Sequence, residues 1–330
     1  MKCKKIILKQ MYNGFPKKSD FEIVDEDVAE DLQNGEFLYE SLAISVDPYI
    51  RAYAGAAYKP GDTVIGTALV RVTKSKNEQF QNGKLLVLHC GWRNGGKAKE
   101  SDVLFVRDDM PASVPESAGL GLYGIAGLTA WVGWILVCKI KEGETIFISG
   151  AAGAVGNVAA QIGKIKGCTV VGSCGTDEKV KFCKNIGYDA VFNYKKESES
   201  LDAAIKRVAP KGIDCYFDNV GGSFSSTILR NMNSGGRVGV CGSISAYNET
   251  TPVLAPIVQT SMVSSELMLK GFLLRSYVSN YKEAYEDLKK WTIEGKMKCH
   301  EKVTKGFENV PDAFIDMLRG GNVGKAVVRL

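Results

Sequence analysis

Residues 145–166 combine a strand-forming run, a glycine-rich turn and a helix-forming stretch. The run Thr-Ile-Phe-Ile-Ser at 145–149 is rich in β-branched residues, and 154–166 is rich in alanine and valine. Between them, glycines would let the backbone approach an anion, and the free N–H groups at the helix start would bind it. A tight turn without a ligand is the alternative, but the strand and helix that flank the motif favour a dinucleotide site. The predicted phosphate-binding residues are Gly150, Gly153, Ala154, Val155 and Gly156.

Downstream of residue 140, apolar runs of strand length alternate with segments of helix length. Strands are predicted at 145–149, 169–173, 190–193, 214–218, 237–241 and 268–274. Helices are predicted between them, at 154–166, 177–186, 200–208 and 223–232. This alternation is typical of a parallel sheet with helices on both faces. The predicted fold class is therefore α/β, with a Rossmann doubly wound parallel sheet.

The first hundred residues differ, because they show strand-like runs and turn signals but little helical periodicity. Extended runs are predicted at 4–8, 36–44, 63–72 and 85–89. A last helix at 280–294 precedes a tail that is strand-like at both ends and is expected to return to the first domain. The predicted domains are a β-rich catalytic domain at 1–122, a Rossmann domain at 123–301 and the returning tail at 302–330.

The stretch 117–138 carries no charged residue and is long enough to cross a membrane. It contains five glycines, and no second segment of this kind occurs in the chain. A membrane span is the alternative. The glycines and the absence of a closely flanking basic cluster favour a buried helix that enters a domain core.

The charge and the cysteine pattern exclude several classes of protein. The 330 residues carry a net charge of +5, which is too balanced to indicate nucleic-acid binding. Nine cysteines are spread without a CxxC pair, only two histidines occur, and the chain opens without a secretory signal pattern. We therefore expect reduced thiols, a cytoplasmic location, no structural zinc site and no membrane partner.

The end of the second Rossmann strand indicates which nicotinamide cofactor is bound. An NAD site usually carries an acidic residue there, which accepts hydrogen bonds from the ribose 2′-hydroxyl. Here the strand ends Ser173-Cys174-Gly175, without a carboxylate, and Lys179 follows in the first turn of the next helix. A lysine at this place would attract the 2′-phosphate of NADP, although it could also be a solvated helix charge. The predicted cofactor is NADPH or NADP⁺.

Several motifs in one order carry a resemblance to a known family. They are VDPYIR at 46–51, GLTA at 127–130, AAGAVG at 151–156, GTDEK at 175–179, FNYK at 192–195, DCYFDNVGG at 214–222, CGSISAYN at 241–248 and GNVGK at 321–325. Over nearly its whole length the chain resembles the zinc-independent medium-chain dehydrogenases/reductases. The zinc-dependent relatives carry a Cys and a Gly-His-Glu where this chain has 45–48 (SVDP) and 66–68 (GTA).

The resemblance implies a GroES-like first domain and an oxidoreductase acting on CH–CH groups. The implied reaction is NADPH-dependent reduction of the carbon–carbon double bond of α,β-unsaturated ketones and aldehydes, such as 15-oxo-prostaglandins and lipid alkenals. Hydride would reach the β-carbon, and the enolate would then be protonated. Alternatives are an NADPH quinone reductase of the same superfamily, a non-catalytic NADPH-binding protein, and the reverse oxidation of a hydroxyl. A homodimer formed through the edge strand at 268–274 is also implied.

The resemblance also assigns further residues to the cofactor. Lys179 and Tyr194 would bind the 2′-phosphate, although Tyr194 could instead be a strand-end aromatic. Asn219 would hold the nicotinamide half, or could cap the turn before the next two glycines. The other implied cofactor residues are Cys241, Gly242, Ser243, Ile244, Ser245, Tyr247, Phe272, Leu273, Leu274 and Asn322.

Two tyrosines are candidates for the catalytic hydroxyl that would donate to the carbonyl oxygen of the substrate. Tyr247 is the leading candidate, together with the ribose hydroxyl of the cofactor itself, and Tyr49 is the second. Each tyrosine could instead be a core aromatic. One departure concerns substrate choice, because this chain has Ser264 and Ser265 where mammalian relatives carry a tyrosine before Glu-Leu.

Overall fold

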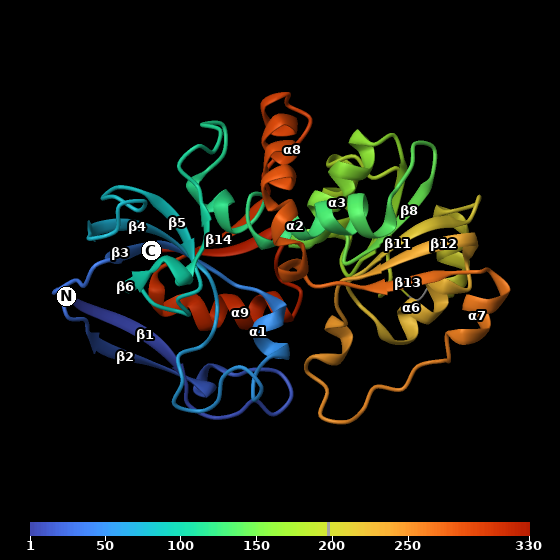
Figure 1. Ribbon diagram of the computed structural model, residues 1–330. Coiled ribbons are helices and arrows are strands. Elements are labelled where there is room, and N and C mark those ends of the chain that lie inside the picture. Colours follow the sequence, from blue (N-terminus) through green and yellow to red (C-terminus); the bar gives the residue numbers. More distant parts are fainter. Residues whose placement is uncertain (197–198) are drawn as a thin grey trace. The chain divides into compact units, whose positions relative to one another are not determined.

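The computed structural model describes residues 1–196 and 199–330 (Figure 1). The chain forms two compact units. We call Met1–Gly124, Glu301–Asn322 and Ala326–Leu330 the β-rich unit, and Ile125–His300 with Val323–Lys325 the Rossmann unit. The domain boundaries predicted from the sequence were after residues 122 and 301.

The Rossmann unit is built on a six-stranded sheet in the order β10-β9-β8-β11-β12-β13. Its strands are β8 (Thr145–Ser149), β9 (Thr169–Cys174), β10 (Ala190–Asn193), β11 (Ile213–Asp218), β12 (Met232–Val240) and β13 (Met268–Gly271). Every neighbouring pair is parallel, which confirms the predicted doubly wound sheet. The last strand ends at Gly271, so the prediction of a strand through residue 274 was wrong at its C-terminal end.

Helices connect these strands, and α3 and α6 lie on opposite faces of the sheet (Figure 1). The bounds are α3 (Ala154–Ile165), α4 (Asp177–Asn185), α5 (Leu201–Val208), α6 (Gly222–Leu229), α7 (Gln259–Ser264) and α8 (Tyr281–Ile293). Side-chain caps set two of the starts, because Thr176 and Ser200 accept hydrogen bonds from backbone N–H groups of α4 and α5. Helix α7 was not predicted, since its short sequence shows no apolar periodicity.

The uncharged stretch 117–138 lies within the protein core. It forms a 3₁₀ turn (Glu116–Leu120), helix α2 (Ile125–Trp131) and a π-helical segment (Val132–Cys138). A Cβ on Gly133 would lie 2.3 Å from the ring of Phe217, so only glycine permits this close approach to the sheet. In the described residues no helix is long and apolar enough to cross a membrane, and the predicted buried helix is confirmed.

The β-rich unit contains a seven-stranded sheet in the order β14-β15-β3-β4-β5-β7, with β6 paired to β3, and a two-stranded sheet of β1 and β2. The strands are β1 (Lys2–Leu8), β2 (Phe21–Asp27), β3 (Glu36–Ser45), β4 (Ala68–Ser75), β5 (Leu85–Leu88), β6 (Gly95–Lys99), β7 (Val103–Val106), β14 (Glu301–Lys305) and β15 (Lys325–Arg329). β4 begins only at Ala68, so the predicted strand at 63–72 was wrong over its first five residues.

The tail of the chain joins this sheet, because β15 pairs antiparallel with β3. Between β14 and β15 the tail forms helix α9 (Val310–Leu318), which the sequence analysis did not predict. The Phe314 ring of α9 packs edge-on against Trp92 at 5.4 Å and Phe21 at 6.2 Å. Helix α9 therefore closes the apolar core of the β-rich unit.

Candidate cofactor and active site

The glycine-rich loop between β8 and α3 has the geometry of a phosphate cradle. Gly150 adopts a φ of 64°, which a side chain would disfavour. The N–H of Gly153 donates to the Gly150 carbonyl at 2.9 Å and closes the turn. A Cβ on Gly156 would lie 2.4 Å from that same carbonyl oxygen, so the first turn of α3 packs directly on the loop backbone. Gly150 and Gly156 thus each have a geometric reason to be glycine.

The N-terminus of α3 is left open for an anion. No side chain caps it, and Gly153, Ala154 and Val155 are partly exposed. The N–H groups of the first helical residues have no acceptor within the helix, and they carry the positive end of the dipole of a 12-residue helix. The N–H of Gly324 donates to the Ala152 carbonyl at 2.8 Å, which ties the tail of the chain to the loop. These residues fit a dinucleotide diphosphate.

The tip of β9 fits a phosphorylated ribose. Thr176 caps α4 by accepting from the Lys179 N–H at 3.2 Å, which places Lys179 in the first turn, where it is half-buried. The nearby Asp177 accepts from the Asn193 side chain at 3.0 Å and pairs with Lys196 at 2.7 Å. The Asn193 hydrogen bond and the Lys196 ion pair lower the pKa of Asp177. This carboxylate is therefore engaged at the end of β10.

Tyr194 lies beside the β9 tip. Its N–H donates to the Cys174 carbonyl at 3.1 Å, and its hydroxyl lies 3.3 Å from the place of a Cβ on Gly175. The ring packs edge-on against Phe224 at 5.7 Å, and burial raises the pKa of the phenol. The strand end thus presents a protonated tyrosine hydroxyl next to the loop that carries Lys179.

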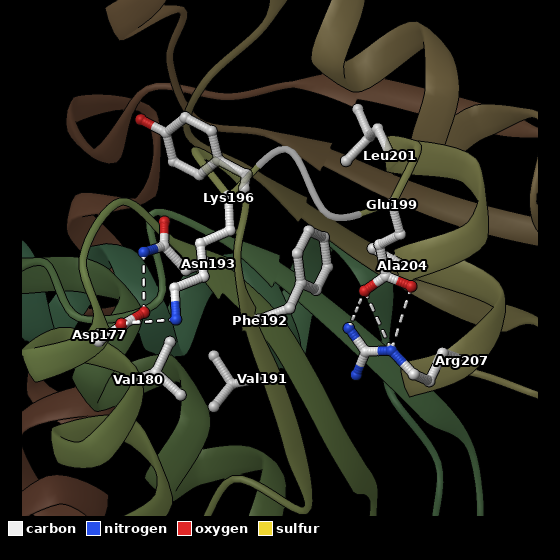
Figure 2. A pocket seen from close by; sticks show the side chains of 11 residues that line it. Asp177, Val180, Val191, Phe192, Asn193, Lys196, Glu199, Leu201, Ala204 and Arg207 are labelled. Carbon is white, nitrogen blue, oxygen red and sulfur yellow. Dashed lines mark hydrogen bonds and ion pairs between the residues drawn. The ribbon is translucent and has the colours of Figure 1, made fainter.

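A cavity of about 210 Å³ lies between α4, β10 and α5 (Figure 2). Tyr194 lines it, as do two ion pairs, Asp177 with Lys196 and Glu199 with Arg207. Its charged side chains pair with one another, as the dashed lines in Figure 2 show. The cavity therefore borders the predicted 2′-phosphate residues and presents balanced charge.

Asn219 lies at the end of β11, and its side-chain amide donates to the Ser149 carbonyl at 2.8 Å. The cap on the following turn comes from Asp218, whose Oδ1 accepts from the N–H groups of Val220 at 3.0 Å and Gly221 at 2.9 Å. The alternative that Asn219 caps this turn was therefore wrong. Asn219 instead links the C-terminal ends of β8 and β11, and parallel α/β folds bind ligands at this end of their strands.

The turn after β12 folds back on this region. The N–H groups of Cys241 and Gly242 donate to the Asp218 carbonyl at 2.8 and 3.1 Å. The Tyr247 hydroxyl accepts from the Ser243 N–H at 3.2 Å, and it would lie 2.9 Å from a Cβ on Gly242. Burial raises the pKa of Cys241 to about 12, so it remains a thiol. Within this turn, Ile244 and Ser245 form a short 3₁₀ segment (Ile244–Ala246).

Phe272, Leu273 and Leu274 follow the edge strand β13. The Phe272 ring packs edge-on against Phe217 at 6.1 Å, so it contributes to the core. Leu273 is 45% exposed. Leu274 begins a 3₁₀ segment (Leu274–Asn280).

Two predicted site residues, Tyr49 and Asn322, belong to the β-rich unit. Tyr49 lies in the short helix α1 (Pro48–Ala52), and its hydroxyl is buried without a hydrogen-bond partner among the described residues. Burial raises the pKa of Tyr49 well above its usual value. Asn322 is 8% exposed. An unsatisfied buried hydroxyl is costly, so the Tyr49 hydroxyl would gain from donating a hydrogen bond to a ligand.

The β-rich unit also holds a cavity of about 620 Å³. Ile65, Gly66, Cys90 and Arg93 are among its lining residues. Burial raises the pKa of Cys90 to about 11, and Arg93 is paired with Glu26 at 3.0 Å. Among the described residues, no group of three or more His, Cys, Asp or Glu side chains is placed to hold a metal ion.

The sequence analysis missed three buried residues that join the C-terminal ends of β8 and β11, where the nicotinamide half is predicted to bind. These are Ser149, Tyr216 and Asp218, which are 0%, 0% and 5% exposed. Asp218 stands at the end of a strand and directly before Asn219, where an acidic residue can cap a turn. The position of Asp218 was the one signal in the sequence that could have indicated a capping role. Tyr216 and Ser149 gave no such signal, because both fit an ordinary strand pattern.

Comparison with known protein families and sequences finds similarity in both units of the chain. A family model described as "Zinc-binding dehydrogenase" matches residues 154–290, and one described as "N-terminal domain of oxidoreductase" matches residues 4–106. Prostaglandin reductase 1 of Bos taurus is 43% identical over 323 residues, which cover 98% of this chain and 97% of the relative.

Two further proteins extend the comparison. The NADP⁺-dependent 2-alkenal reductase of Nicotiana tabacum is 37% identical over 336 residues, covering 98% of this chain and 96% of the relative. The crystal structure of CurA from Vibrio vulnificus in complex with NADPH superposes with a TM-score of 0.90 at 31% identity. That match covers 99% of this chain and 98% of the other.

Proposed function

This chain belongs to the prostaglandin reductase 1 family of medium-chain dehydrogenases/reductases, and from this premise we propose that it is an NADPH-dependent enone reductase. It reduces the carbon–carbon double bond of α,β-unsaturated ketones and aldehydes. The observation that carries the proposal is the full-length similarity to reductases of prostaglandins and alkenals. The carboxylate-free tip of β9 and the open N-terminus of α3 support NADPH as the cofactor.

The roles of the residues follow from their placement. The loop from Gly150 to Gly156 would bind the diphosphate, and Lys179 with Tyr194 the 2′-phosphate. NADPH, when bound, supplies a hydride for the β-carbon of the substrate. Negative charge then develops on the carbonyl oxygen, where a hydroxyl donor stabilises it. Tyr247 is our leading donor and Tyr49 the second, and water or a tyrosine then protonates the α-carbon.

The first test follows NADPH absorbance with the purified protein. The substrates are 15-oxo-prostaglandin E2, 4-hydroxynonenal and a simple quinone, with NADH in parallel. We expect NADPH oxidation with the enone and the enal, and a saturated ketone or aldehyde as product. Turnover with the quinone alone would make the protein a quinone reductase. Binding of NADPH without any turnover would leave a non-catalytic cofactor-binding protein.

Lys179→Ala is expected to weaken NADPH binding selectively. A lysine ammonium near the 2′-phosphate contributes a charge-assisted hydrogen bond, and its loss should raise the Kd for NADPH about tenfold. NADH lacks this phosphate, so its Kd should stay unchanged. The two values are measured by nicotinamide fluorescence. Lys184→Ala, in the last turn of the same helix, is the matched control. An equal change for NADH and NADPH would contradict the role of Lys179.

We also propose a homodimer that forms through the β13 edge of the sheet. Strand β13 and the segments just before and after it in the sequence expose large apolar side chains, which in a monomer would remain in water. They are Leu254, Ile257, Val263, Met268 and Val278, at 87%, 76%, 80%, 61% and 63% exposure. Light scattering coupled to gel filtration should give twice the chain mass, and Val263→Lys should shift it toward the monomer.

A zinc-independent mechanism and a cytoplasmic location complete the proposal. The positions that carry metal ligands in zinc-dependent relatives read SVDP at 45–48 and GTA at 66–68. All nine cysteines are free, which suits a reducing compartment.

A further inference from the structure

Tyr216 is the centre of a buried hydrogen-bond network in the Rossmann unit. Its hydroxyl lies 2.8 Å from Asp218 Oδ1, 2.9 Å from Ser225 Oγ and 3.1 Å from Ser149 Oγ. A phenol has one proton, and the carboxylate is the strongest and nearest acceptor. Tyr216 therefore donates to Asp218 and can accept from Ser225. Burial raises the pKa of Tyr216 well above its usual value, so the phenol keeps its proton.

Asp218 in turn accepts hydrogen bonds from two turns. Its Oδ1 also accepts from the N–H groups of Val220 and Gly221, at 3.0 and 2.9 Å. Its backbone carbonyl accepts from the N–H groups of Cys241 and Gly242, at 2.8 and 3.1 Å. One residue at the end of β11 thus holds the turn that follows its own strand and the turn that follows β12.

The two turns are joined to each other as well. The N–H of Ile244 donates to the Asn219 carbonyl at 3.2 Å. The Ser245 hydroxyl donates to the Val220 carbonyl at 2.6 Å. At the far end of this turn, the Tyr247 hydroxyl accepts from the Ser243 N–H at 3.2 Å. Hydrogen bonds, together with the short backbone stretch from Gly242 to Ser245, therefore connect the Tyr216 phenol to the Tyr247 phenol.

We propose that Tyr216, acting through Asp218, is a positioning residue for Tyr247 and Asn219 in the reduction. This inference rests on the proposed function, in which Tyr247 is the leading donor, and on the predicted role of Asn219 in holding the nicotinamide half. Tyr216 lies inside the sheet and only orders the loops that present these two residues. The buried carboxylate of Asp218 needs the phenol as a donor, because a buried charge with too few hydrogen bonds is unfavourable. Without the phenol, the carboxylate would shift and would displace the turn whose N–H groups it accepts from.

The test is Tyr216→Phe, which removes one oxygen and keeps the ring. In the cofactor-free protein, the amides of the two turns, residues 219–221 and 241–247, should exchange with deuterium about tenfold faster, since one hydrogen bond to the network is lost. At saturating NADPH and enone, kcat should fall about tenfold, because a small displacement of a catalytic group is costly. The Kd for NADPH should change far less than kcat, because the phosphate-binding loop from Gly150 to Gly156 and Lys179 lie outside this network.

Thr292→Val is the matched control, because it also removes one buried hydroxyl from the Rossmann unit. Thr292 donates to the Leu288 carbonyl at 2.8 Å within α8, away from the network. It should lower the melting temperature without changing kcat or the exchange of residues 219–221 and 241–247. If Tyr216→Phe behaved like this control, Tyr216 would have a structural role only.

A double-mutant cycle identifies the route of the effect. If Tyr216 acts through Tyr247, Tyr216→Phe should lower kcat much less in a Tyr247→Phe background than in the wild type. Full additivity would overturn the proposal. A wild-type protein that turned over no enone would instead refute the proposed function. The exchange rates and NADPH fluorescence of Tyr216→Phe would then still show whether Tyr216 orders these loops.

Discussion

We expect Gly156→Ala to abolish measurable NADPH binding. The added Cβ would lie 2.4 Å from the Gly150 carbonyl oxygen and 2.7 Å from that of Ala151. Both contacts are to backbone, which cannot rotate away as a side chain could. The first turn of α3 must then move away from the loop, and its N–H groups would no longer point at the same phosphate. The strain should also lower the free energy of unfolding by about 1–3 kcal/mol.

Two measurements check this expectation, NADPH titration by fluorescence and unfolding in urea. The matched control is Gly271→Ala in β13, where a Cβ would meet nothing within 4 Å. That variant should retain binding, and its stability should change little, because alanine suits a strand better than glycine does. A Gly156→Ala protein with the Kd of the wild type would show that the loop does not carry the diphosphate.

We expect Tyr247→Phe to lower kcat about 10²-fold with an enone at saturation, because one donor to a developing oxyanion contributes this much. The Tyr247 hydroxyl accepts from the Ser243 N–H, which fixes its direction while its proton can be donated. Phenylalanine retains the ring, so the Kd for NADPH should remain close to that of the wild type. The loss should therefore appear in kcat far more than in binding.

Tyr49→Phe is the companion variant, because Tyr49 is the second candidate donor and its hydroxyl has no partner in the β-rich unit. Steady-state kinetics and NADPH fluorescence are measured for both variants. Full kcat in Tyr247→Phe would remove Tyr247 as the donor. A loss confined to Tyr49→Phe would transfer the role to Tyr49.

Much of the Rossmann unit could be predicted because its signals are local. The run at 145–149, the glycines that follow it and the helix after them are neighbours in the chain, and steric limits act on neighbours directly. The same holds for the tip of β9, where a missing carboxylate and Lys179 are separated by only a few residues. These features predicted the fold class, the cofactor and the phosphate loop.

Other elements could not be predicted because their stability comes from distant contacts. Helix α9 packs its apolar face on a core that includes Trp92, which contacts Phe314 although it lies more than 200 positions away in the sequence. The local sequence does not show this contact. The first half of the predicted strand at 63–72 has strand-like residues, yet it is not part of a regular strand. It forms only an isolated bridge between Thr63 and Ile7 and hydrogen bonds of Val64 with Ile6 and Trp92. β-propensity depends strongly on such tertiary context, which the local sequence does not reveal.

The active-site side chains divide in the same way. Sequence alone was sufficient for the residue types and their order, since glycine, lysine and tyrosine stand at recognisable places in recurring motifs. Only the tertiary structure showed that Asp218 rather than Asn219 caps the turn after β11. Only the structure also showed that the Tyr216 hydroxyl hydrogen-bonds to Asp218. The reason is physical: hydrogen bonds in a parallel sheet join residues about 70 positions apart, such as Ser149 and Asn219, and strand order and register decide which of them meet.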